Sequence, residues 1–304
     1  MADRQVTQQT ILSHLAKLDD PDADLRYMSL NDLFTILSSP SSSFLASDNR
    51  SSNKLAEGLL KALDDQHGDV QNQALKCLGP LAVRLPFESL VPLLEKLSNL
   101  TTSQTIDTSV PNTAIRTIVD TLPRPQAGQP APQNAVTAYQ AVSKVLIPRL
   151  TGPTQSASGR RGSVVRGMLE KDPSKGFSSD AIDVLIKVVT CFGPLLSESE
   201  LVALQEPVMA IIHNDTAGTV VTKRALAAIS ALVLYFSDNQ LNAFVKRLTE
   251  TLSSPNISTV HRRHLIAAIG VIARSAPAKL GPHLNSLAPF VFSAVGEDNL
   301  VQAN

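Results

Sequence analysis

Residues 69–81 read Asp-Val-Gln-Asn-Gln-Ala-Leu-Lys-Cys-Leu-Gly-Pro-Leu, and the spacing within this stretch decides the fold. Counted from Val70, the positions +4, +7, +8 and +11 hold small or apolar residues, namely Ala74, Cys77, Leu78 and Leu81. Residues three and four apart lie one above the other on an α-helix, so these side chains share one face. The stretch therefore predicts an amphipathic helix with a narrow apolar face.

The same spacing occurs six times along the chain. Its +8 position holds an aliphatic residue each time: Leu33, Leu78, Ile118, Leu185, Ile229 and Ile269. The steps between consecutive members are 45, 40, 67, 44 and 40 residues, and a period of about 40–47 is typical of HEAT and armadillo repeats. The sequence thus predicts an all-α fold, a single α-solenoid (superhelix) of HEAT repeats over residues 1–304 in which each repeat packs on its neighbours.

Six helix pairs and one unpaired final helix follow from the pattern. We expect helices at 6–18 with 25–38, 52–64 with 69–85, 87–99 with 109–122, 134–150 with 177–190, 198–212 with 218–236, 239–252 with 258–274, and 280–295 alone. The second helix of each pair carries the apolar spacing. Its +4 residue is small in five of the six repeats, which lets neighbouring helices approach closely. Asp32 occupies a +7 position and is expected at the edge of the buried face; the alternative is that the first repeat is slightly rotated.

Three segments interrupt the repeats. We expect a Ser-rich loop at 39–53 and an extended Pro-rich connector at 123–133. The Gly-, Ser- and Arg-rich residues 151–175 account for the long step of 67 and are expected to form a flexible basic insertion within the fourth repeat.

Composition narrows the class of protein. Lys plus Arg and Asp plus Glu both number 27, so no overall positive field draws the chain to nucleic acid or to a membrane surface. The N-terminus has no apolar run of signal-peptide length, and no stretch of about 18 apolar residues occurs. We expect a soluble protein of the cytoplasm and nucleus, with Cys77 and Cys191 as buried, reduced thiols.

Two stretches resemble a known family. Residues 24–33, Asp-Leu-Arg-Tyr-Met-Ser-Leu-Asn-Asp-Leu, and residues 59–81, which contain the run quoted above, resemble the opening repeats of the cullin-associated, neddylation-dissociated protein family. Members are HEAT-repeat exchange factors of cullin-RING ubiquitin ligases. The resemblance covers the whole chain in order, but only about the first quarter of a typical member.

The resemblance implies a function and a partner. In the family, the N-terminal arch grips the C-terminal region of an unneddylated cullin with its RING subunit and covers the lysine that receives the ubiquitin-like modifier. Binding therefore blocks neddylation and regulates ligase (SCF) assembly and the exchange of substrate receptors. The C-terminal part of the family, which displaces the adaptor, is missing from this chain.

The final predicted helix suggests a second polypeptide. One stripe of it is apolar and comprises Leu284, Leu287, Ala288, Val291, Phe292 and Val295. Solenoid ends normally carry a polar cap, so we expect this stripe to be a stacking face for a separate polypeptide with the C-terminal HEAT repeats. The alternative is that the chain is a fragment of a longer protein.

Candidate partner-binding residues lie on the outward side of the second helices, in two groups. The first comprises Arg26, Asn31, Gln71, Asn72 and Arg116. Arg26 could instead pair with the turn at Asp22 and Asp24, whereas no structural role is evident for Gln71 and Asn72.

The second group is a basic ridge that would meet an acidic partner surface: Lys223, Arg224, Arg262 and Arg263. The alternative is a merely solvated helix end. A metal site at His261-Arg-Arg-His264 is disfavoured, because two more ligands are needed and two arginines repel a cation.

One modification site is a candidate. Arg160-Arg-Gly-Ser163 matches the preference of basic-directed kinases for Ser163 and resembles a weak nuclear-import patch. The alternative is a plain solvated loop.

No phosphate-binding loop, catalytic triad or carboxylate pair is found. The sequence predicts no enzyme, no metal, no cofactor and no small-molecule substrate. Two other binding functions stay open, an importin-type transport receptor and a scaffold subunit of a phosphatase. The absence of an acidic run disfavours the first, and the long insertion disfavours the second.

Overall fold

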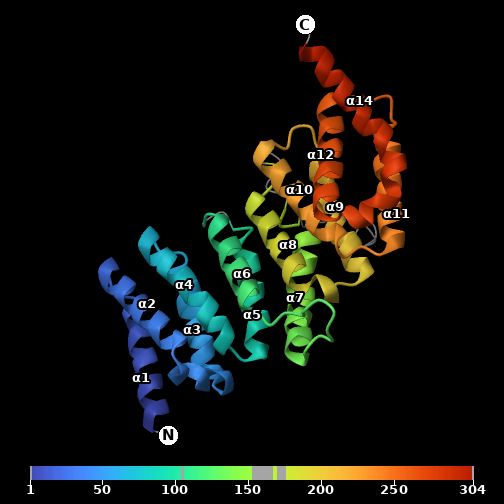
Figure 1. Ribbon diagram of the computed structural model, residues 1–304. Helices are drawn as coiled ribbons and strands as arrows, with labels where there is room; N and C mark the ends of the chain where they lie inside the picture. The colour runs from blue at the N-terminus through green and yellow to red at the C-terminus, as the bar shows by residue number, and fades with distance from the viewer. Residues whose placement is uncertain (1, 104–105, 153–166, 170–175, 303–304) are drawn as a thin grey trace, which may run out of the picture. The chain divides into compact units, whose positions relative to one another are not determined.

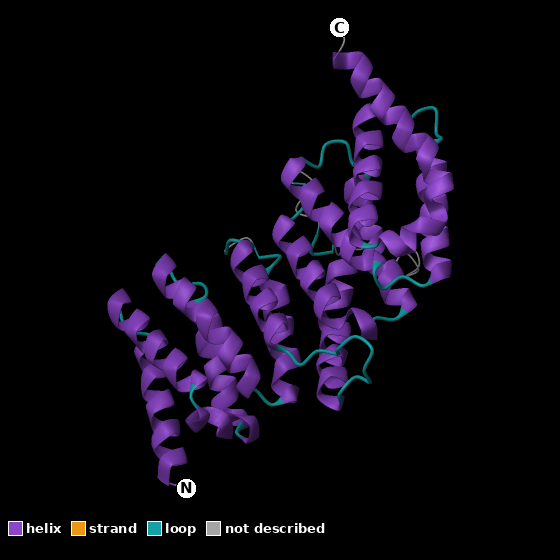
Figure 2. Cartoon of the chain, viewed as in Figure 1, coloured by secondary structure: helices purple, strands orange, loops and turns teal. Residues whose placement is uncertain are grey.

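The computed structural model describes residues 2–103, 106–152, 167–169 and 176–302 and is helical (Figures 1 and 2). Its contacts divide the chain into two compact units, Met1–Arg149 and Leu150–Asn304. Each unit is described by itself, and a single continuous solenoid stays a prediction.

The first unit consists of two layers of helices. Its elements are α1 (Ala2–Lys17), α2 (Ala23–Ser38), the 3₁₀ helix η1 (Pro40–Ser47), α3 (Asn49–Ala62), α4 (Gly68–Arg84), α5 (Phe87–Leu100), α6 (Ser109–Thr121) and most of α7 (Gln133–Thr151). Helices α2, α4 and α6 pack side by side, while α1, α3 and α5 each pack on the helix that follows them (Figure 1). This is the arrangement that paired repeats predict.

The second unit repeats this plan. Its elements are α8 (Ser179–Phe192), η2 (Gly193–Leu195), α9 (Glu198–Ile212), α10 (Thr219–Val233), α11 (Asp238–Leu252), α12 (Thr259–Ser275), α13 (Pro277–Leu280), η3 (Gly281–His283) and α14 (Leu284–Gln302). Helix α10 packs between α8 and α12, α9 covers α10, and α11 packs against α12 and α14. The twelve helices of the predicted pairs are confirmed to within a few residues, although α7 and α8 belong to different units and their pairing stays a prediction. The final helix, predicted at 280–295, instead runs from Leu284 to Gln302 after the short α13 and η3.

The repeating apolar positions form the core of both units. All six +8 side chains are at most 5% exposed, and all six +4 side chains are buried as well. Complete burial of one such Leu or Ile contributes about 1.5–3 kcal/mol. Asp32 is exposed at the edge of this face, as predicted, with one carboxylate oxygen 3.8 Å from Nδ1 of His14.

Side-chain caps set several helix starts. The Ser197 and Ser237 hydroxyls each accept a hydrogen bond from the backbone N–H three residues on, and the serine N–H in turn donates to the side-chain oxygen of Glu200 or Gln240. These reciprocal bonds satisfy N–H groups that have no partner within the helix. Asp22 caps α2 in the turn where the sequence places it.

The Ser-rich segment 39–53 is not a loop. Its first part is η1, with Leu45 and Ser42 fully buried, and α3 begins at Asn49 with Asp48 as its cap. The Ser42 hydroxyl donates to the Ser39 carbonyl at 2.8 Å. Bonds between residues three apart hold a 3₁₀ helix together, so a search for a 3.6-residue period does not find it.

The predicted flexible insertion at 151–175 is partly packed. Met168 and Leu169 are buried, and the Ser178 N–H donates to the Leu169 carbonyl at 2.8 Å. The backbones of Gly152 and Gly167 meet so closely that a Cβ on Gly167 would lie 3.0 Å from the Gly152 nitrogen. Residues 153–166 and 170–175, which include Ser163, lie outside the described residues.

The remaining observations concern connections and cysteines. The Pro-rich stretch between α6 and α7 contains no helix. Cys77 and Cys191 are buried and form no disulfide, as predicted, and burial raises the pKa of Cys77 to about 12. Among the described residues, no helix combines the length and the apolar character needed to cross a membrane.

Candidate partner-binding surfaces

Helices α10 and α12 form a basic surface within the second unit, here named the α10–α12 face. Neither helix contains Asp or Glu, and together they carry five cationic residues: Lys223, Arg224, Arg262, Arg263 and Arg274. The covering helices are different, since α9 carries three glutamates and no Lys or Arg, and α11 carries two acidic residues, Asp238 and Glu250, beside two basic ones. A chain with zero net charge therefore carries a local excess of cations on these two helices, of which Arg224 is paired with Asp183 on α8.

The four cations of the predicted ridge differ in whether they are exposed and free of an internal ion pair, and so in whether they can contact a partner. Arg224 forms an ion pair with Asp183 on α8, and this hydrogen bond raises the pKa of its guanidinium. Lys223 and Arg263 are exposed, and neither has an ion pair within the described part of the chain. Arg262 is half-buried. The structure thus brings the predicted cations onto two adjacent helices and leaves Lys223 and Arg263 available.

A groove of about 530 Å³ runs between α10 and α12 and was not predicted from the sequence. Small or apolar residues form most of its wall, and Lys223 and Arg274 belong to it: the full lining is Lys223, Leu226, Ala227, Ser230, Ala267, Gly270, Val271, Arg274 and Ser275. The Ser230 and Ser275 hydroxyls contact each other. The sequence held a signal for this groove. The fifth and sixth repeats are 40 residues apart, so Ala227 aligns with Ala267 and Ser230 with Gly270, which places small residues at matching positions of the two helices.

The histidines of the ridge have structural partners. Nδ1 of His213 and Nε2 of His261 lie 2.6 Å apart, so one ring donates to the other, and Nδ1 of His264 lies 3.0 Å from the Ile212 carbonyl oxygen. Burial lowers the pKa of both His213 and His261. No group of three or more potential metal ligands occurs among the described residues. These histidines join the end of α9 to the start of α12.

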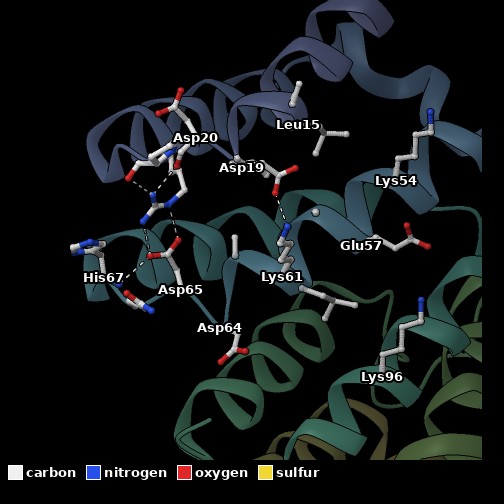
Figure 3. Close-up of a pocket in the computed structure, with 18 of the residues that line it drawn as sticks. Leu15, Asp19, Asp20, Lys54, Glu57, Lys61, Asp64, Asp65, His67 and Lys96 are labelled. Atoms are coloured by element: carbon white, nitrogen blue, oxygen red, sulfur yellow. Dashed lines mark hydrogen bonds and ion pairs between the residues drawn. The ribbon is translucent and has the colours of Figure 1, made fainter. Parts of the chain in front are cut away.

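Arg26 has an internal role in the first unit. Its guanidinium donates to both carboxylate oxygens of Asp65, at 2.8 and 3.1 Å, and to the Asp20 carbonyl at 2.8 Å (Figure 3). Burial alone would raise the pKa of Asp65, but the hydrogen bonds from Arg26 and from the His67 N–H lower it overall. Arg26 therefore ties the start of α2 to the α3–α4 turn, with Asp65 as its ion-pair partner.

Gln71 also has a structural role, which the sequence did not suggest. Its side-chain amide donates to the Leu63 carbonyl at 3.0 Å, at the end of α3. Asn31 accepts a hydrogen bond from Gln73 at 3.3 Å, which links α2 to α4. Asn72 is exposed and Arg116 is half-buried. Of the five predicted residues, Asn31 and Asn72 are exposed, and Asn31 is already bonded to Gln73.

A second, larger groove of about 1250 Å³ lies in the first unit and is lined mainly by α1, α3 and the end of α5 (Figure 3). Charges of both signs line it, and Lys61 and Asp19 form an ion pair at its wall. Because its charged side chains are of both signs, this groove does not favour a partner of one particular charge. The α10–α12 face, with one sign of charge, is the more selective surface.

The apolar stripe of α14 is only partly exposed. Phe292 and Leu284 are 75% and 55% exposed, whereas Leu287 is 1% exposed. Leu287 was predicted to belong to the stacking face, but it packs into the second unit. Val291 is half-buried, and the side chain of Val295 lies outside the described residues. The available apolar surface is therefore centred on Phe292 and Leu284.

Comparisons with known proteins agree on one family. A family model described as "Cullin-associated NEDD8-dissociated protein 1 N-terminal part" matches residues 89–303. A protein of Emericella nidulans with the name Cullin-associated NEDD8-dissociated protein 1, N-terminal part, is 70% identical over 99% of this chain and 88% of its own length.

More distant relatives are longer. The Drosophila melanogaster Cullin-associated NEDD8-dissociated protein 1 is 26% identical over 94% of this chain, which spans 20% of that relative. Among solved structures, a designed armadillo repeat protein matches with a TM-score of 0.38 and 19% identity, over 86% of this chain and 98% of its own.

Proposed function

Because the chain belongs to the family of the N-terminal part of Cullin-associated NEDD8-dissociated protein 1, we propose that it binds an unneddylated cullin with its RING subunit. In this proposal it holds the C-terminal region of the cullin and blocks neddylation. It thereby regulates the assembly of cullin-RING ligases and the exchange of their substrate receptors. The single observation that carries the proposal is the 70% identity to the Emericella nidulans protein over nearly the whole chain.

The proposal includes a second polypeptide with the remaining repeats. Two observations support it: the Emericella nidulans relative is itself named an N-terminal part, and the Drosophila melanogaster relative is about five times the matched length. The exposed Phe292 and Leu284 on α14 provide an apolar surface on which further helices could stack. Action in the cytoplasm and nucleus is part of the same proposal.

Affinity purification tests the proposal. The tagged chain, expressed together with the polypeptide that carries the C-terminal repeats, is expected to recover unmodified cullin and its RING subunit. Addition of both polypeptides to a reconstituted neddylation reaction is expected to slow modification of the cullin. Failure to recover any cullin, with both polypeptides folded and present, would contradict the proposed function.

A further inference from the structure

The α10–α12 groove combines an apolar floor with a positive rim. Ala227, Ala267 and Gly270 form part of its wall, and Gly270 leaves the floor open, since a Cβ added there would meet only Nη1 of Arg274, at 3.8 Å. A small or medium apolar side chain can enter such a space without displacing the protein around it. The groove is therefore preformed for an apolar side chain.

The charges of the groove are of one sign. Lys223 is the fifth residue of α10 and Arg274 lies in the last turn of α12, so the repeat alignment places the two cations toward opposite ends of the groove. Arg263 occupies on α12 the place that Lys223 occupies on α10, 40 residues earlier. No carboxylate on either helix neutralises them. A ligand with negative charges on both sides of an apolar residue would complement this pattern.

Exposed apolar side chains extend the surface beyond the groove. Val220 at the start of α10, Leu234 at its end and Val260 at the start of α12 are exposed large apolar residues. Neither helix carries Phe, Tyr or Trp, on which nucleic-acid bases stack. The combination of aliphatic surface and unpaired cations suits an acidic polypeptide better than a nucleic acid.

From this geometry, we propose that the α10–α12 groove binds an acidic polypeptide segment, with an apolar side chain of that segment inserted over Ala227, Ala267 and Gly270. Lys223, Arg263 and Arg274 contact the acidic residues that flank it. This assignment deepens the proposed function, in which the segment belongs to the cullin–RING partner. It can be tested without that partner.

The test uses the full chain and fluorescent peptides. The acidic probe repeats Glu-Glu-Leu-Ala, the basic probe repeats Lys-Lys-Leu-Ala, and polyglutamate supplies charge without apolar side chains. In fluorescence anisotropy, the acidic apolar probe is expected to bind most tightly and to lose affinity as salt is raised. Equal binding of polyglutamate would show that the groove floor takes no part. Equal binding of an oligonucleotide of matched charge would show a phosphate site instead, and either result overturns the proposal.

Two variants locate the binding. Lys223→Glu with Arg274→Glu is expected to weaken binding of the acidic probe by about tenfold or more. Gly270→Leu fills the floor and is expected to weaken binding while the melting temperature stays at or above that of the unaltered chain, because leucine favours a helix more than glycine does. The control, Lys96→Glu with Lys246→Glu, makes the same charge change on α5 and α11 and is expected to bind normally.

The outcomes separate this inference from the proposed function. The groove assignment would be overturned if the charge-reversal and Gly270→Leu variants bound the acidic probe with unchanged affinity, or if the control variant were weakened equally. This holds whether or not the chain recovers cullin. Failure to recover cullin would overturn the proposed function but would leave the peptide result in place.

Discussion

At the scale of single residues, Gly193 shows how tightly the second unit is packed. This buried glycine follows α8, and a Cβ added to it would collide with the ring of Tyr235. The ring belongs to the turn after α10. The absence of a side chain at residue 193 therefore allows the end of one repeat to contact the end of the next.

Gly193→Ala is expected to destabilise the chain by about 1–3 kcal/mol, because the half-buried Tyr235 ring must move to make room for the Cβ. Urea unfolding followed by circular dichroism measures the change. The control is Gly68→Ala, since a Cβ at Gly68 would meet no atom within 4 Å, and it is expected to unfold like the unaltered chain or slightly later. If the Gly193→Ala variant unfolds at the same urea concentration as the unaltered chain, the Tyr235 ring moves without loss of stability and this account of Gly193 is wrong.

Single residues also show which features the sequence predicts and which it does not. Buried positions such as Leu78 were predictable because the helical period alone places them inside. The roles of Arg26 and Gln71 were not, because Asp65 lies 39 residues from Arg26 and the Leu63 carbonyl lies across a turn from Gln71. Such contacts depend on how the helices pack against one another, so no pattern among neighbouring residues in the sequence predicts them.

At the scale of elements, the His213–His261 pair joins α9 to α12. A hydrogen bond between the two rings needs at least one of them neutral. Burial is the main cause that lowers the pKa of each ring, and each is lowered further by a nearby cation or imidazole: Arg247 and His261 for His213, and His264 for His261. Glu206 acts in the opposite direction on His213, and Asp215 does so on His261, without reversing the shift.

The pair makes stability depend on pH. A lowered folded-state pKa means that the unfolded chain takes up protons first, so stability is complete above the unfolded value of about 6.5 and falls as the pH drops from there through the folded pKa values. Urea unfolding at pH 7.5 and at pH 5.5 is expected to show lower stability at the acidic pH. The variant His213→Gln with His261→Gln is expected to lose part of this dependence, whereas His283→Gln keeps it. An identical pH dependence in the double variant would refute this role.

The elements themselves were largely predictable. Helix pairs such as α11 and α12 were located within a few residues, because apolar spacing and capping residues act locally. The 3₁₀ helix η1 was missed because a helix with three residues per turn does not show the 3.6-residue apolar period. Its Ser42 hydroxyl is buried and bonds to the Leu37 and Ser39 carbonyls. The packed residues Met168 and Leu169 were missed because they are too few to form a pattern.

At the scale of the whole molecule, a neutral chain can still carry a selective surface. Equal numbers of acidic and basic residues give the chain a formal net charge of zero. Within the second unit, the cations of α10 and α12 have no acidic residue on the same helices, whereas α9 carries three glutamates and α11 carries two acidic and two basic residues. The sequence predicted part of this ridge, but the groove beside it depends on how the two helices pack.

The second polypeptide gives a prediction at this scale. Phe292→Asp is expected to weaken association with the polypeptide that carries the C-terminal repeats by about ten- to a hundredfold, the equivalent of the 1.5–3 kcal/mol for burying a large apolar side chain. Analytical ultracentrifugation of the mixture measures it. Val83→Asp, at a similarly exposed apolar residue on α4, serves as control. Equal association of both variants with the polypeptide would place the interface elsewhere.

The central claim is that this chain binds cullin in its unmodified form. The most direct test measures the affinity of the chain, together with the C-terminal polypeptide, for one cullin–RING complex before and after neddylation. The account predicts tight binding to the unmodified complex and a loss of at least about tenfold, or 1.4 kcal/mol, after modification. Equal affinity for the two forms would contradict it.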